Sequence, residues 1–117
     1  MDMNGVAYAI ALGKVIAHHR AHTSYCSTQY ELAQRTAISQ SSLSRYENGQ
    51  TTPDAYDLSK IEDILDLSPG TIMIHARKVS AAMRKAIEAS NRRKTWRPGD
   101  EVAMEAYANL AIAKLFR

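Results

Sequence analysis

The sequence predicts an all-α protein. Apolar residues recur at helical spacing along most of the chain, residues suited to helix starts precede these stretches, and no segment alternates as a strand would. The chain has 117 residues, 45% of them apolar and 23% charged, which is typical of a globular protein rather than a disordered one. This length suits one domain with an extension.

The first predicted helix covers residues 5–19. Its small and apolar residues recur at intervals of three or four and form one stripe: Val6, Ile10, Gly13 and Ile16. The polar stretch AHTSYCST that follows has no period and is predicted to be a loop. Its last residue, Thr28, can cap a second helix over residues 29–35, with Glu31 completing a capping box.

A turn over residues 36–38 precedes the third predicted helix, which Ser39 caps and which runs to Asn48. Gly49 ends it, because glycine accepts the left-handed conformation that closes a helix. Its outer face carries amide, hydroxyl and guanidinium groups, on Gln40, Ser41, Ser44 and Arg45. Such groups match the donors and acceptors on base edges, so the pattern favours a helix that enters the major groove of DNA.

Hydroxyl–proline pairs predict the next two helix starts. A hydroxyl can cap a helix and proline suits its first position, so Thr52-Pro53 begins a fourth helix and Ser68-Pro69 a fifth, which extends to about Ser90. The apolar residues of the fifth follow the spacing of a coiled-coil seam: Ile72, Ala76, Val79, Met83 and Ala86. This seam could be buried within the monomer or face a second copy.

The sixth predicted helix is capped by Asp100, after a Pro98-Gly99 stop, and ends near Phe116. It is apolar on two sides, with Val102, Ala106, Leu110 and Ala113 on one and Ala108, Ile112 and Leu115 on the other. Such a helix needs several partners, and two C-terminal helices alone make a thin core. We therefore expect homodimerisation, with an interface made of Ile72, Ala76, Val79, Met83 and Leu110.

Charge is unevenly distributed along the chain. Residues 1–70 carry a net charge of −3, residues 71–97 carry +7 and residues 98–117 carry −1. The basic segment surrounds Trp96, and its Arg92 and Arg93 are candidates for phosphate contact, because nonspecific affinity for DNA depends on neutralising phosphates. The alternative is a solvated face, or a bridge to acidic residues of a neighbouring subunit.

The stretch from Gln29 to Gly49 resembles the Xre/Cro family of helix-turn-helix proteins, which are phage-repressor-like DNA binders. The resemblance covers residues 12–67 and rests on these elements: Gln29, Leu32-Ala33, Ile38-Ser39, the run LSRYENG from Leu43 to Gly49, and Thr52-Pro53. It implies a five-helix lambda-repressor-like helix-turn-helix domain over residues 5–67. Residues 68–117 would then form a helical C-terminal dimerisation region.

The resemblance also implies roles for single residues. The base contacts would come from Gln40, Ser41, Ser44 and Arg45. Phosphate contacts would come from Gln29, Asn48 and Gln50, with Gln29 also bracing Gln40. Glu47 is expected to be structural, bound to nearby backbone or to an arginine such as Arg35. The sequence departs from the family pattern at Ala37, where the turn usually has glycine, and at Thr36, where the residue is usually apolar.

Other kinds of site receive little support. His18, His19 and His22 with Cys26 could suggest a metal, but adjacent histidines point to different faces of a helix, so no metal or cofactor is expected. No catalytic set or phosphate-binding glycine loop is present, so an enzyme is not expected. No apolar run reaches the roughly 18 residues of a membrane span, and the start resembles a helix rather than a signal peptide. These features, with a single cysteine, predict a cytoplasmic protein.

The sequence therefore predicts a sequence-specific transcriptional regulator, a repressor that binds a palindromic operator as a homodimer. Its expected partners are double-stranded DNA and a second copy of the chain. The alternative is an antitoxin-type or adaptor protein whose C-terminal helices bind another protein. The net negative charge of residues 1–70 favours this alternative.

Overall fold

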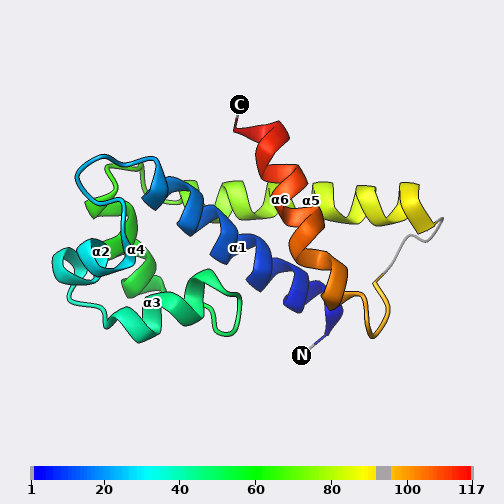
Figure 1. Cartoon of the computed structure of the whole chain (residues 1–117), viewed down its shortest axis with the longest axis horizontal. Helices are drawn as coiled ribbons and strands as arrows, with labels where there is room; N and C mark the ends of the chain where they lie inside the picture. The colour runs from blue at the N-terminus through cyan, green and yellow to red at the C-terminus, as the bar shows by residue number, and fades with distance from the viewer. Residues whose placement is uncertain (1, 92–95, 117) are drawn as a thin grey trace.

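The computed structural model describes residues 2–91 and 96–116 and shows, over that part of the chain, six α-helices and no strand. They are α1 (Met3–Ala21), α2 (Gln29–Thr36), α3 (Gln40–Glu47), α4 (Ala55–Ile64), α5 (Thr71–Asn91) and α6 (Glu101–Leu115). Helices α2 to α4 lie together at one end, and α6 packs on α5 toward the other (Figure 1). Helix α1 joins these groups through contacts with α3, α5 and α6, and the predicted all-α fold is confirmed.

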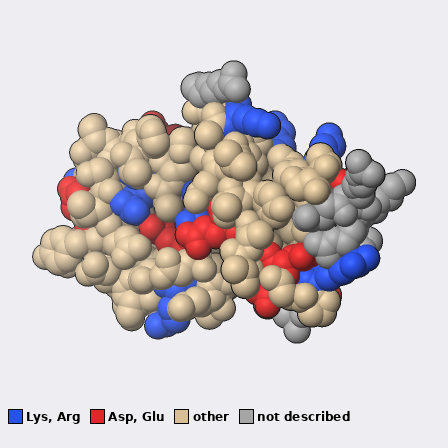
Figure 2. Space-filling model, turned by 45° about the vertical axis from the view of Figure 1, so that its right-hand side comes forward, with Lys and Arg blue, Asp and Glu red and all other residues tan. Residues whose placement is uncertain are grey.

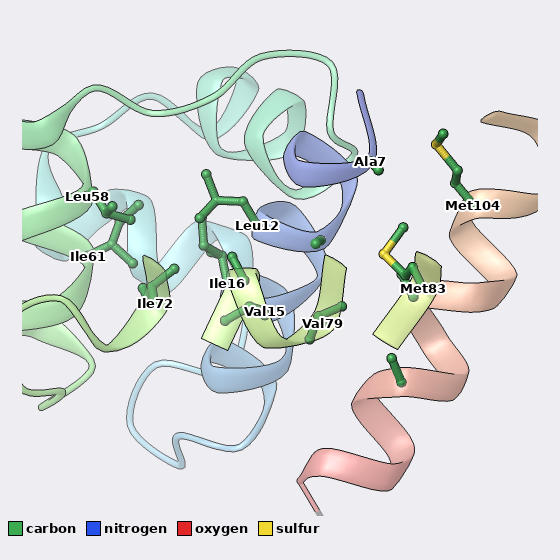
Figure 3. Packing of buried hydrophobic residues seen from close by; sticks show 14 of the residues in the cluster. Ala7, Leu12, Val15, Ile16, Leu58, Ile61, Ile72, Val79, Met83 and Met104 are labelled. Carbon is green, nitrogen blue, oxygen red and sulfur yellow. The ribbon is translucent and has the colours of Figure 1, made fainter. Parts of the chain in front are cut away.

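One hydrophobic core runs through both groups of helices. Figure 3 follows it from Leu58 and Ile61 of α4, past Ile16 of α1, to Met83 of α5 and Met104 of α6. Each of these side chains is at most 7% exposed. The boundary predicted between residues 67 and 68 therefore lies within a continuous core, and the division into two domains stays a prediction.

The apolar seam of α5 belongs to this core. The side chains of Ile72, Ala76, Val79 and Met83 are each 0% exposed, because α1, α4 and α6 of the same chain pack against α5. The expectation that these four residues face a second copy is thus corrected: they have no surface left for a partner. Ile87, rather than the half-buried Ala86, continues the seam. The prediction failed because it assumed that the first four helices complete their hydrophobic core without α5. In the structure α1 also packs along α5.

Leu110 is the exception among the expected interface residues. It lies on α6, and its side chain is 59% exposed. The buried face of α6 consists instead of Met104, Ala108 and Ala111. The sequence placed apolar residues on two sides of this helix, and the structure buries only one of them within the chain.

The capping of α4 and α6 differs from the prediction. Asp54, not Thr52, caps α4, and its carboxylate accepts the Asp57 N–H at 2.7 Å. Asp100 precedes α6 as predicted, but its carboxylate accepts the Arg97 N–H at 2.7 Å and makes no capping bond to α6. Asp54 thus binds an N–H three residues later, inside its helix, whereas Asp100 binds one three residues earlier, outside its helix.

Helix α5 begins at Thr71 instead of Ser68-Pro69, and a buried carboxylate accounts for this start. Glu62 is 6% exposed and accepts the Gly70 N–H at 3.1 Å and the Ile72 N–H at 2.9 Å. A helix start has unpaired N–H groups and a positive dipole end, and both favour a carboxylate there. Glu62 thus links α4 to the start of α5.

The turn between α2 and α3 has the geometry that the family pattern implies. Ala37 is left-handed, with φ 59° and ψ 19°, so alanine stands in a conformation that favours glycine. Thr36 is buried, but its hydroxyl donates to the Leu32 carbonyl at 2.7 Å and accepts the Ile38 N–H at 3.2 Å. The polar group at this core position is therefore fully hydrogen-bonded.

Ala37→Gly is expected to raise the free energy of unfolding by about 1 kcal/mol. The strain of a left-handed alanine disappears, and this gain exceeds the entropy that a glycine adds to the unfolded chain. Urea denaturation measures the change. Ala33→Gly is the matched control within α2 and should lower stability by about 1 kcal/mol. Equal losses at both positions would contradict the assignment of strain to Ala37.

Candidate nucleic-acid interface

Helix α3 has well-defined ends. At its start, the Ser39 hydroxyl accepts the Ser42 N–H at 3.1 Å, as the capping prediction requires. At its end, Gly49 adopts φ 74° and the Gln50 N–H donates to the Arg45 carbonyl at 2.9 Å. This closing pattern needs a left-handed residue just past the helix, which explains the glycine.

Gly13 lets α3 rest directly on α1. A Cβ atom at Gly13 would lie 2.7 Å from the carbonyl oxygen of Glu47 and closer still to that of Tyr46. No side chain larger than hydrogen fits between the two helices. The last turn of α3 is therefore positioned by backbone contact rather than by side chains alone.

A buried ion pair holds the same end of α3. Glu47 is 6% exposed, and the Arg20 guanidinium donates to both of its carboxylate oxygens, at 2.7 and 2.9 Å. Arg20 also donates to the Ser27 carbonyl, and its hydrogen bond to Glu47 raises the pKa of Arg20. The expected structural role of Glu47 fits this geometry, but its partner is Arg20 and not Arg35.

Gln29, the first residue of α2, also binds Glu47. Its Nε2 donates to Glu47 Oε1 at 3.1 Å. The expectation that Gln29 braces Gln40 is therefore wrong in this structure, because its amide is directed to the buried carboxylate. A phosphate contact from the start of α2 stays a prediction.

Tyr46 ties α3 to α4. Its hydroxyl donates to Asp57 Oδ2 at 2.7 Å. Burial, together with this hydrogen bond, raises the pKa of Tyr46 to about 12, so the phenol stays protonated and keeps donating at neutral pH. With Gly13 and Arg20, this bond anchors the inner side of α3 to two other helices.

The outer side of α3 is open to solvent. Gln40, Ser41 and Arg45 are exposed and Ser44 is half-buried. Arg45 Nη2 donates to Ser42 Oγ at 3.1 Å. Ser42, which is not among the predicted contact residues, thus orients the Arg45 guanidinium. The structure brings the four predicted base contacts onto one rigid helix face, as insertion into a major groove requires.

Further polar groups flank the start of α3. Tyr30 is 61% exposed and, with Gln34 and Gln40, lines a groove of about 450 Å³ beside the turn. Tyr30 and Gln34 are not among the residues predicted from the sequence. Their spacing of four residues, which puts two side chains on one face of α2, was the signal that could have identified them.

The other end of α3 is less favourable for phosphate. Asn48 is exposed but borders a groove of about 300 Å³ that Glu101 and Glu105 also line. Glu105 pairs with Lys14 at 2.7 Å, a contact that lowers the pKa of this carboxyl. A phosphate at Asn48 would therefore meet negative charge, whereas Gln50 is exposed beyond the helix end.

The molecular surface carries no single strongly basic face in the view of Figure 2, where acidic and basic side chains are interspersed among uncharged ones. Arg92 and Arg93, the predicted basic phosphate contacts, lie outside the described residues. On α2 and α3 themselves, the described candidates for DNA contact are mainly hydrogen-bonding groups, with Arg45 as a cation among them.

Four histidines gather where α1, α5 and α6 meet. His19 Nε2 and His75 Nδ1 share a hydrogen bond of 2.9 Å, and the rings of His18 and His75 each lie 4.8 Å from that of Phe116. Among the described residues no group of His, Cys, Asp or Glu side chains is arranged to hold a metal ion. Cys26 is fully buried, and burial raises the pKa of its thiol.

Stability is expected to fall as the pH decreases from 6.5 towards 4. Burial, with the neighbouring His75, lowers the pKa of His19 to about 4, and burial also lowers those of His18 and His75. The unfolded chain takes up protons near pH 6.5 and the folded chain does not, so acid favours unfolding. Urea denaturation at pH 7 and pH 5 measures this difference. His19→Gln should reduce it, and an unchanged difference in that variant would contradict the assignment.

The comparison with protein families points to the same stretch. Residues 28–72 match the family described as Helix-turn-helix, and this match spans α2, α3 and α4. Neither the comparison with curated proteins nor the comparison with solved structures found a match. No helix of the described residues is long and apolar enough to span a membrane.

Proposed function

Because this chain carries a helix-turn-helix domain of the Xre/Cro-like family of DNA-binding transcription regulators, we propose that it is a repressor that binds a palindromic operator as a homodimer. Gln40, Ser41, Ser44 and Arg45 contact base edges, and the start of α2 and Gln50 contact phosphates. By occupying a promoter, the bound dimer would block RNA polymerase. We place this regulator in the cytoplasm. The half-sites are about 10 base pairs apart, one helical turn.

The observation that carries this proposal is the contrast between the two sides of α3. Its inner side is fixed by Gly13, by the Arg20–Glu47 pair and by the Tyr46–Asp57 bond. Its outer side presents exposed amide, hydroxyl and guanidinium groups. A glutamine pairs well with adenine and an arginine with guanine, each discriminating by about 1–3 kcal/mol.

The proposed test is selection of bound duplexes from a random pool by the full chain at low salt. We expect an enriched sequence with twofold symmetry. Gln40→Ala is expected to change the enriched sequence, whereas Ser59→Ala, an exposed substitution on α4, should leave it unchanged. Failure to enrich any sequence would contradict the proposal.

The proposed dimer uses the open face of α6. Val102 is 87% and Leu110 is 59% exposed, and the exposed Ala106 and Ala113 lie on the same side. An apolar stripe of this kind on a surface helix favours a partner. In sedimentation experiments the wild-type chain should be a dimer and Leu110→Glu a monomer, while Glu101→Gln should remain dimeric. A monomeric wild-type chain would contradict this part of the proposal.

The same stripe also favours the second candidate, an adaptor or antitoxin-type protein. The carboxylates of Glu101 and Glu105 beside Asn48 are the specific observation in its favour, because they disfavour phosphate at one end of α3. In that case the chain would co-purify with a different protein bound at α6. Leu110→Glu would release that protein, and no duplex would be retained at low salt.

A further inference from the structure

Two grooves adjoin on the side of α1 that faces α5 and the α3–α4 connection. One has a volume of about 770 Å³ and runs between the start of α1 and the middle of α5. The other has a volume of about 420 Å³ and lies between α1, α4 and the start of α5. Gly5 and Tyr8 line both, so the two grooves are direct neighbours, and we treat them as two parts of one candidate groove.

The larger part of the groove is rich in cationic donors. Arg77, Lys78 and Arg84 line it, and their side chains make no hydrogen bond or ion pair with any described residue. The one carboxylate in this lining, that of Asp2, already accepts the Gly5 N–H at 2.9 Å. Three cations without carboxylate partners around a concave surface favour an anionic group.

Trp96 adds an unsatisfied donor to the same part. Its side chain is 8% exposed and lines the groove, and its Nε1 has no hydrogen-bond partner among the described residues. A buried donor without a partner destabilises the folded state, so an acceptor supplied by a ligand would remove a penalty that the free protein carries.

The smaller part of the groove is apolar. Leu12, Pro53, Leu58 and Met73 line it, and Met73 is 49% exposed. Its other lining residues bring in no charge. Apolar surface at one end and unpaired cations at the other suit a molecule with a hydrocarbon part and a negatively charged head.

We propose that this groove binds a small amphipathic anion, with its hydrocarbon part against Leu12, Pro53 and Met73 and its carboxylate or phosphate between Arg77 and Arg84. The site is separate from the outer face of α3, so it goes beyond the proposed DNA contact. Helix α1, which forms one wall of the groove, also carries Gly13 and Arg20, the residues that position α3.

The test uses the full chain without DNA, so its outcome does not depend on operator binding. Trp96 is the only tryptophan of the chain, and its fluorescence therefore reports on the groove directly. Titration with decanoate should change this fluorescence saturably and raise the Tm. Decanol, with the same chain but no charge, and acetate, with the charge but no chain, should each bind at least tenfold more weakly.

Matched substitutions locate the effect. Arg77→Glu and Met73→Lys should weaken decanoate binding at least tenfold, whereas their exposed neighbours Lys85→Glu and Ile74→Lys, which do not line the groove, should not. Circular dichroism verifies folding, and Arg84→Gln replaces Arg77→Glu if that variant does not fold. No saturable response to decanoate, equal binding of decanol, or equal losses in the control variants would overturn the proposal.

Discussion

Arg20→Ala should lower the free energy of unfolding by about 3–5 kcal/mol. Glu47 is 6% exposed, and its carboxylate would lose the two charged hydrogen bonds that compensate for its burial. Gln29 alone would remain as a side-chain donor to it. Urea denaturation of the wild-type chain and the variant at pH 7 measures the loss.

The Arg20 experiment has an internal control. Adding Glu47→Gln to Arg20→Ala removes the unpaired charge, so the double variant should be more stable than Arg20→Ala alone. Lys14→Ala breaks the exposed pair with Glu105 and should leave stability nearly unchanged. A loss below about 1 kcal/mol for Arg20→Ala would mean that the buried pair does not hold α3, contrary to our account.

Gly13→Ala is expected to cost at least about 3 kcal/mol, at the upper end of what overpacking produces. The added Cβ would lie 2.7 Å from the Glu47 carbonyl oxygen, and because this neighbour is backbone it cannot rotate away. Helices α1 and α3 would have to separate. Alanine is the better helix former, so any loss of stability reports the clash rather than propensity.

Gly70→Ala is the comparison for Gly13→Ala. Gly70 has φ +89°, but no atom lies within 4 Å of a Cβ built there, so only the backbone conformation is penalised. Its cost should be about 1 kcal/mol. If Gly13→Ala is no more costly than Gly70→Ala, the close contact between α1 and α3 does not exist in solution.

Local patterns were sufficient to predict the helices and the turn between α2 and α3. The capping box at Thr28, the cap at Ser39 and the closing glycine at Gly49 involve residues within a few positions of each other, so they can be recognised without knowledge of the fold. The start of α5 could not be predicted in this way. It depends on Glu62, which belongs to a different helix.

The candidate site shows the same limit. The outer face of α3 follows from helical spacing, and the structure presents its residues as expected from that spacing. Long-range partners were missed: Arg20 lies 27 positions before Glu47, and nothing local to either residue indicates the pair. The seam of α5 was correctly recognised as apolar, but the pattern cannot tell a neighbouring helix from a second chain, and α1 and α6 cover it.

Arg45→Ala distinguishes base contacts by the outer face of α3 from contacts to phosphate alone. Fluorescence anisotropy with the selected operator and its single-base variants should show a loss of about 1–3 kcal/mol and no remaining preference at one base pair of each half-site. Lys85→Ala, which removes a charge on α5, should keep that preference. If Arg45→Ala weakens binding to all sequences equally, Arg45 contacts phosphate, and α3 does not recognise bases as we propose.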